Sequence, residues 1–182
     1  MRILLGVTGS VAATLTAKLA EALLALGHEL KIVATASSFY FLKSGSIADD
    51  LENMGIEVIA ETDEWPGEKY HKDQPIPHID LGKWADILLV APVTAQTIYK
   101  IAHGAADNLL TSSVLAWDRK KRIVLAPAMN TNMWTNPLTQ ENLGKINKIY
   151  KVTVAGPVAK KLACGDIGVG AMAPIENIVH LI

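Results

Sequence analysis

Short apolar runs alternate with amphipathic segments along most of the chain. The runs are rich in Ile, Leu and Val and carry no polar face, which is typical of strands buried on both sides of a parallel sheet. Between them, apolar residues repeat at helical spacing. We expect strands over residues 2–8, 29–35, 56–60, 86–92, 122–127 and 152–155. We expect helices over residues 11–26, 39–43, 94–103, 108–117 and 174–181.

Strands and helices in this order are typical of parallel βαβ units. The sequence therefore predicts an α/β fold over residues 1–182: a single-domain, doubly wound parallel sheet of the Rossmann or flavodoxin-like type, with helices on both faces. In such sheets, ligands bind beyond the carboxyl ends of the strands. We therefore expect the site in the loops that follow Val7, Val33, Val90 and Leu125.

Two long segments interrupt this repeat. Residues 61–77 are polar, contain three prolines and are too long for an ordinary connection, so they form either a solvated loop or a functional one. Residues 156–174 contain four glycines and the only cysteine of the chain. This second segment is too apolar for a disordered tail, and we predict that it is a flap over the substrate.

The composition excludes several classes of protein. Half of the 182 residues are apolar and 19% are charged, which suffices for a core without disulfides. With 17 basic and 18 acidic residues, the formal charge of -1 excludes a strongly basic nucleic-acid binder. One cysteine excludes a disulfide framework and a multi-cysteine zinc site. No apolar run approaches the roughly 20 residues that span a bilayer. We expect a cytoplasmic protein with no metal, nucleic-acid or membrane partner.

The loop after the first predicted strand has the composition of a phosphate site. Gly9, Ser10 and Val11 place backbone N–H groups and a hydroxyl at the start of a helix. The segment is neither a Walker A loop nor a G-x-G-x-x-G fingerprint. The second strand ends at hydroxyls, including Ser37, where a dinucleotide site would have an acid for the ribose. These residues favour a mononucleotide such as FMN, and an ordinary strand-to-helix turn also explains them.

Four further places in the sequence carry side chains that could bind a ligand or take part in a reaction. Residues 94–97 place hydroxyls and one amide at a strand end, where they could contact a polar ring or a ribityl chain. Asn130 follows the next strand and either binds an anionic ligand group or caps a helix. His78 opens a predicted helical turn, and its neighbour Asp80 cannot be assumed to touch it. Cys164, beside two lysines, is either a proton donor or nucleophile, or an inert thiol.

Several motifs together resemble those of the homo-oligomeric flavin-containing Cys decarboxylases, over residues 3 to about 173. The P-A-M-N-x-x-M-W segment at residues 127–134 marks that family at large, including the lantibiotic peptide decarboxylases. The L-A-C-G-D-x-G-x-G segment at residues 162–170 resembles the members that serve coenzyme A biosynthesis. Further matches lie at residues 9–11, 78, 92–97 and 107–110.

The resemblance implies an FMN-dependent lyase. It would decarboxylate 4′-phospho-N-pantothenoylcysteine to 4′-phosphopantetheine and CO₂. The flavin would oxidise the cysteine moiety of the substrate, the carboxylate would leave, and the reduced flavin would return the electrons, so that no net reductant is consumed. The alternatives are a decarboxylase of C-terminal peptide cysteines, of the lantibiotic type, and another FMN-binding member of the family.

The resemblance also implies roles for individual residues. His78 and Cys164 would be catalytic. The substrate would contact Asn130, Lys161, Leu162 and Ala163. FMN would contact Gly9, Ser10, Val11, Ser37, Thr94, Ala95, Gln96, Thr97 and Ala128. Members of the family form homotrimers or trimer-built homododecamers with the flavin near an interface, so His78 and Asn130 at one flavin would come from different chains.

Two positions depart from the family pattern. Gln96 stands where Asn is usual, which keeps the amide but lengthens the side chain by one methylene. Ala171 stands where many bacterial members have Arg. If that Arg binds the phosphate of the substrate, Lys160 or Lys161 would have to do so here.

Overall fold

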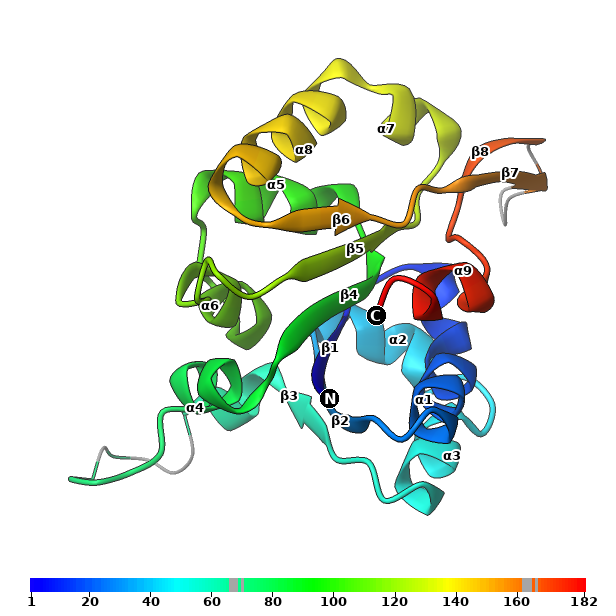
Figure 1. Ribbon diagram of the computed structural model, residues 1–182. Helices are drawn as coiled ribbons and strands as arrows, with labels where there is room; N and C mark the ends of the chain where they lie inside the picture. The colour runs from blue at the N-terminus through cyan, green and yellow to red at the C-terminus, as the bar shows by residue number, and fades with distance from the viewer. Residues whose placement is uncertain (66–68, 70, 162–164, 166) are drawn as a thin grey trace.

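A computed structural model describes residues 1–65, 69, 71–161, 165 and 167–182. Within these residues, six parallel strands form one sheet in the order β3-β2-β1-β4-β5-β6 (Figure 1). The strands are β1 (Arg2–Val7), β2 (Glu29–Ala34), β3 (Val58–Ala60), β4 (Ile87–Val93), β5 (Ile123–Pro127) and β6 (Val152–Val154). This is the strand order of the Rossmann fold, so the predicted doubly wound α/β sheet is confirmed.

The central strands lack a polar face because both sides of the sheet are covered. In β1, Ile3, Leu5 and Val7 belong to the apolar core on one side, whereas Leu4 belongs to the core on the other. Every residue of β4 is buried. Successive side chains of a strand point to opposite faces, so a strand between two cores must be apolar throughout.

Helices cover both faces of the sheet, as predicted (Figure 1). One face holds α1 (Thr16–Ala25), α2 (Phe39–Leu42), α3 (Ile47–Asn53) and α9 (Ile175–Val179). The other holds α4 (Pro77–Trp84), α5 (Ala95–His103), α6 (Leu109–Leu115) and α8 (Pro137–Ile149). No helix within the described residues is long and apolar enough to cross a membrane.

The segment predicted as a helix over residues 11–26 has two parts. It begins as the 3₁₀ helix η1 (Val11–Leu15) and continues as α1. The hydroxyl of Ser10 caps η1 by accepting a hydrogen bond from the backbone N–H of Ala12 at 3.4 Å. The other predicted strands and helices differ from the observed ones mainly at their ends, where boundaries are least well defined.

Helices α3 and α8 were not predicted, α4 was predicted only as a helical turn opened by His78, and a helix over residues 131–135 was one of two interpretations of Asn130. In α8 the buried residues are Thr139, Asn142 and Ile146, and Leu143 packs against the same core while partly buried, so two of these four inward positions are polar. Hydrophobic periodicity is weak in such a helix. Its beginning is nevertheless well defined, because Asn136 accepts a hydrogen bond from Leu138 N at 2.9 Å and Pro137 occupies the first helical position.

Both interrupting segments contain regular structure. Residues 61–77 begin with the 3₁₀ helix η3 (Glu61–Glu64), whose last residue is buried, and they end at the start of α4. A wholly solvated loop is therefore wrong for this segment. Residues 156–174 contain an antiparallel pair, β7 (Val158–Lys161) and β8 (Ile167–Ala171).

Candidate active site

Hydrogen bonds hold the carboxyl ends of neighbouring strands together. After β1, the hydroxyl of Thr8 donates to the carbonyl of Pro92 at 2.9 Å and accepts from Thr94 N at 3.0 Å. On the other side of β1, Thr35 N donates to the carbonyl of Val7 at 3.0 Å. The loops after β1, β2 and β4, which contain most of the predicted FMN contacts, therefore lie side by side.

Gly9 and Ser37 form the closest approach between two of these loops. A Cβ atom built on Gly9 would lie 2.6 Å from Cβ of Ser37 and closer still to its hydroxyl. Only glycine fits at this position without moving the second loop. The hydroxyl of Ser37 lies 3.2 Å from that of Thr35. Backbone N–H groups and hydroxyls at such a strand edge are suitable partners for a phosphate.

The residues after β4 form the first turn of α5. The hydroxyl of Thr94 accepts a hydrogen bond from Thr97 N at 3.3 Å and lies 3.1 Å from the hydroxyl of Thr97. Thr97 is buried, whereas Gln96 is exposed. The two threonines therefore define the start of the helix, and Gln96 is the most exposed member of this run.

Asn130 caps a helix, in agreement with one of its two predicted interpretations. Its side-chain oxygen accepts a hydrogen bond from Asn132 N at 2.8 Å at the start of α7 (Thr131–Thr135). The same loop is joined to β4, because Ala128 N donates to the carbonyl of Val93 at 3.1 Å. The predicted FMN contact at residue 128 and the predicted substrate contact at residue 130 thus lie at the same sheet edge as the loops above.

The β7–β8 hairpin is attached to this Asn130 loop. Met129 N donates to the carbonyl of Gly170 at 2.9 Å. A Cβ atom on Gly170 would collide with the carbonyl oxygen of Met129, and one on Gly168 would lie 3.2 Å from Cβ of Thr131. The glycines of the predicted flap therefore permit β8 to approach the backbone of the loop closely.

Several predicted substrate and catalytic positions cannot be placed in detail. Lys161 is the last residue of β7, and its side chain is not described. Leu162, Ala163 and Cys164 lie outside the described residues.

His78 faces an acid that sequence reasoning missed. Its Nδ1 atom lies 2.8 Å from Oε1 of Glu64, at an angle that is less favourable than that of a regular hydrogen bond. The Glu64 side chain is 6% exposed and that of His78 is 23% exposed. The carboxylate of Asp80, which is closer in sequence, instead accepts a hydrogen bond from Ile76 N at 3.2 Å. No pattern in the polar segment 61–77 indicated that Glu64 would be the residue that faces His78.

One chain does not bring all of the predicted residues together. Figure 1 shows α4, which carries His78, at the opposite end of the molecule from the β7–β8 hairpin. The residues predicted to contact FMN, Asn130 and the hairpin gather near the strand ends. The helix that carries His78 is thus separated from the hairpin within a single chain.

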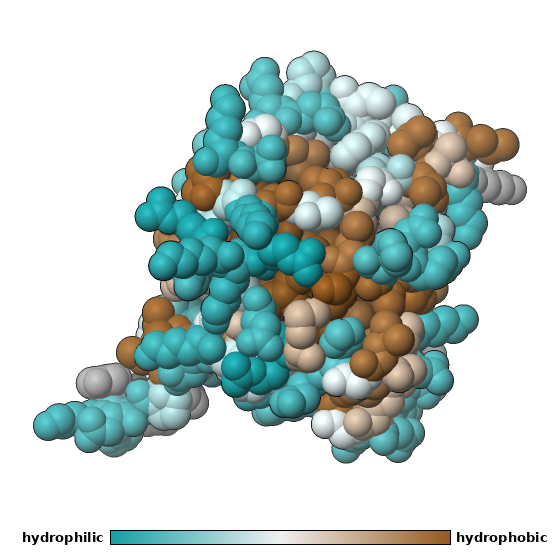
Figure 2. All heavy atoms as spheres, in the orientation of Figure 1, coloured by the Kyte–Doolittle hydropathy of each residue, from teal (hydrophilic) through white to brown (hydrophobic). Residues whose placement is uncertain are grey.

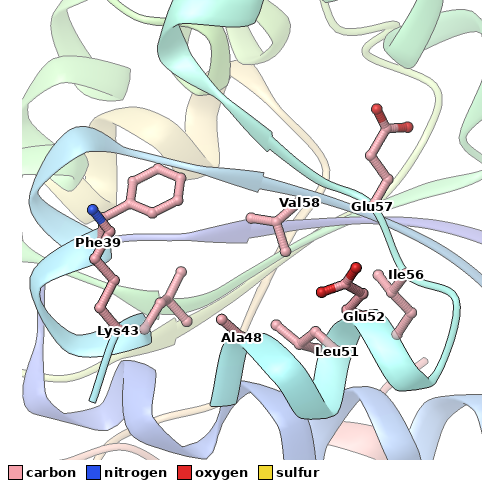
Figure 3. Close-up of a pocket in the computed structure, with 9 residues that line it drawn as sticks. Phe39, Lys43, Ala48, Leu51, Glu52, Ile56, Glu57 and Val58 are labelled. Carbon is pink, nitrogen blue, oxygen red and sulfur yellow. The ribbon is translucent and has the colours of Figure 1, made fainter. Parts of the chain in front are cut away.

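A hollow of about 350 Å³ lies elsewhere, between α2, α3 and β3 (Figure 3). Leu51 of α3 and Val58 of β3 point toward each other across it. Most of its lining is apolar, with Lys43, Glu52 and Glu57 among the charged members. Within the described residues, its lining includes none of the predicted site residues, so this hollow is separate from the candidate site.

Comparison with known proteins identifies relatives that share the whole fold. A Schizosaccharomyces pombe protein named "Probable thymidylate synthase" is 45% identical over 179 residues, which are 97% of this chain and 28% of that protein. A Mus musculus protein named phosphopantothenoylcysteine decarboxylase is 42% identical over 179 residues, covering 98% of this chain and 83% of that protein. The chain thus spans under a third of the first relative and most of the second.

Solved structures that resemble this chain also match it over nearly its whole length. A cysteine-to-serine mutant of PPC decarboxylase, complexed with pantothenoylaminoethenethiol, has a TM-score of 0.89 and 39% identity, covering 99% of this chain and 94% of that one. The FMN binding protein AtHal3 has a TM-score of 0.83 and 38% identity, covering 99% and 93%. Residues 1–182 also match the family described as Flavoprotein. This match and the relatives above show that the chain belongs to the Flavoprotein family.

Proposed function

We propose that this chain is an FMN-dependent decarboxylase that converts 4′-phospho-N-pantothenoylcysteine to 4′-phosphopantetheine and CO₂. The observation that carries the proposal is the hydrogen bond between Met129 and Gly170, because it joins the Asn130 loop to the hairpin beside the glycine- and hydroxyl-lined strand ends. The mouse relative named for this activity and the structural neighbour in complex with pantothenoylaminoethenethiol support the choice of substrate.

The residues at the strand ends suit FMN. Gly9 leaves space beside Ser37 that a side chain would fill, and hydroxyls and backbone N–H groups surround this point. The proposed contacts are Gly9, Ser10, Val11, Ser37, Thr94, Ala95, Gln96, Thr97 and Ala128. When bound, FMN would supply reversible acceptance of electrons from the cysteine moiety of the substrate. Its binding to AtHal3 supports this assignment.

The protein residues would orient the substrate and move its protons. The amide of Asn130 would hold the substrate carboxylate without adding a charge, while its side-chain oxygen caps α7. His78 would accept and return a proton during oxidation and decarboxylation. Cys164 would donate the proton that the product needs at carbon. Lys161, Leu162 and Ala163 would contact the substrate.

We further propose that the site is completed by a second copy of the chain in a trimer or a trimer-built dodecamer. The separation of α4 from the hairpin within one chain supports a shared site (Figure 1). The hairpin also exposes apolar side chains: Ile167 is 85% exposed, and Figure 2 shows apolar atoms at this projecting end. Such residues are suited to contact with another molecule. A cytoplasmic location and a single domain over residues 1–182 stay predictions.

The alternative, a decarboxylase of C-terminal peptide cysteines, is less well supported. The relatives at about 42% identity over nearly the whole chain include proteins named for the phosphopantothenoyl substrate. A peptide decarboxylase would share the flavin and Asn130 but would require a hairpin that accepts a peptide.

Product analysis tests the proposal. The purified protein, reconstituted with FMN, is incubated with 4′-phospho-N-pantothenoylcysteine and, separately, with a peptide that ends in cysteine. We expect the first substrate alone to lose the mass of one CO₂ in mass spectrometry. Decarboxylation of the peptide alone would favour the alternative. A colourless protein that cannot be reconstituted with flavin would contradict both.

A further inference from the structure

Glu64 has no role in the function proposed above, although its buried carboxylate lies beside the proposed acid/base residue His78. Glu64 ends η3, and His78 is the second residue of α4. Their Oε1 and Nδ1 atoms are 2.8 Å apart, and the carboxylate is almost fully buried. A carboxyl group removed from water is costly unless a hydrogen-bond donor or a cation faces it. The pair therefore has a defined geometry that an exposed surface pair would lack.

Both backbones that carry the pair are held in place. Asp63, beside Glu64, accepts a hydrogen bond from Ala60 N at 2.7 Å and so fixes the start of η3. At the far end of α4, Nζ of Lys121 donates to the carbonyls of Gly82 at 2.8 Å and Ala85 at 2.6 Å. The imidazole and the carboxylate therefore meet between two anchored elements.

The contact selects one tautomer of a neutral imidazole. An ionised carboxylate attracts an N–H group and repels a nitrogen lone pair, so Glu64 favours a proton on Nδ1 of His78. The lone pair then lies on Nε2, at the opposite side of the ring.

We propose that Glu64 is a positioning residue that holds the proton on Nδ1 of His78 and directs Nε2 toward the substrate as the proton acceptor. This inference rests on the proposed acid/base role of His78. Glu64 touches neither the flavin nor the substrate in this proposal. It acts by fixing the orientation and the tautomer of the imidazole, as acidic partners of functional histidines do elsewhere.

Imidazole NMR tests the tautomer without reference to activity. The FMN-loaded protein is labelled with ¹⁵N-histidine, and the His78 signals are assigned by their loss in His78→Asn. We expect the wild-type signals of the Nδ1–H tautomer for neutral His78. In Glu64→Gln, whose amide can donate as well as accept, we expect a shift toward the Nε2–H tautomer. A wild-type Nε2–H tautomer would overturn the proposal, whether or not Glu64→Gln folds.

Kinetics provides the second measurement. We expect Glu64→Gln to lower kcat by about 10- to 100-fold with little change in KM or flavin content, as for other partners that orient a functional histidine. Glu64→Asp, which keeps the charge, should recover part of this loss. The matched control is Asp80→Asn, which neutralises the other acid near His78 but keeps an acceptor for Ile76 N, and it should retain wild-type kcat.

The two proposals fail in different ways. Normal turnover by His78→Asn would remove the acid/base role of His78. Loss of turnover in His78→Asn, combined with an unchanged tautomer and kcat in Glu64→Gln, would overturn only the role of Glu64.

Discussion

At the scale of single residues, one side chain can serve both the fold and the ligand. Asn130 accepts a hydrogen bond at the start of α7 and also stands where the substrate carboxylate is proposed to bind. The sequence left these two interpretations open, because an amide after a strand suits either. The cap is now established, and the ligand contact requires a substitution that separates the two roles.

The substitution Asn130→Asp should separate the helix-capping role of this residue from its proposed contact with the substrate. Aspartate caps helices about as well as asparagine, so we expect the free energy of unfolding to change by less than about 0.5 kcal/mol. Its charge would repel the substrate carboxylate, so we expect a rise in KM of at least about tenfold, which corresponds to about 1.4 kcal/mol. Urea unfolding and steady-state kinetics measure the two quantities. An unchanged KM would remove Asn130 from the proposed carboxylate site.

Gly9 has a steric role that can also be tested. Gly9→Ala places a Cβ atom against Ser37, so the loop after β2 must move. We expect a cost of about 1–3 kcal/mol in stability, as for other overpacked positions. We also expect FMN affinity to fall about tenfold or more, measured by fluorescence titration.

Gly144→Ala is the matched control for Gly9→Ala. A Cβ atom on Gly144 of α8 meets nothing within 4 Å, and alanine is the better helix former. This variant should bind FMN as the wild type does. Equal affinities in both variants would show that the Gly9–Ser37 approach is not part of the flavin site.

At the scale of elements, the sequence predicted most of those whose buried face is apolar, although it missed α3, which buries Leu51. The strands of the central sheet were recognisable because two cores make them apolar throughout. Helix α8 was missed because Thr139 and Asn142 occupy much of its buried face. The hairpin was recognised only as a glycine-rich flap, because its short strands expose Ile167 and Val169 and lack a two-sided core.

The junction of α5 and α6 gives a prediction for stability against pH. Nζ of Lys100 donates to Asp107 at 2.6 Å, and this hydrogen bond holds the pKa of Asp107 below its ordinary value of 3.8. Stabilisation is therefore present above that ordinary pKa and is lost as the pH falls through the lowered one. Because the carboxylate is largely exposed, we expect about 1 kcal/mol or less.

Asp107→Asn should remove this pH-dependent contribution. Urea unfolding near neutral pH should show the variant to be slightly less stable than the wild type, and the difference should shrink in acid and in high salt. A difference that is the same in acid as at neutral pH would mean that the charge of Asp107 contributes nothing.

At the scale of the whole molecule, the proposed site depends on assembly. Within one chain, α4 and the β7–β8 hairpin lie at opposite ends (Figure 1). A shared site requires that two copies place the His78 of one beside the Asn130 loop of the other. Closed symmetric assemblies repeat such an interface at every subunit.

Mixing two impaired variants tests the shared site. At a substrate concentration well below the KM of Asn130→Asp, neither His78→Asn nor Asn130→Asp alone should turn over the substrate at a normal rate. After dissociation and reassembly of an equal mixture, about a quarter of the shared sites would hold both wild-type residues, so activity should reappear. Light scattering verifies that assemblies have reformed. Reassembled mixtures that stay inactive would place both residues in a single chain or remove one from the reaction.

The sequence by itself determined the doubly wound sheet and the loops that carry the candidate site. Strand burial and helix periodicity are local patterns, and the ligand edge follows from the parallel order of the strands. Only the tertiary structure decided that Glu64, and not Asp80, faces His78, and that β8 lies against the Asn130 loop. These contacts join separate elements, and their geometry comes from packing, which no local pattern in the chain specifies.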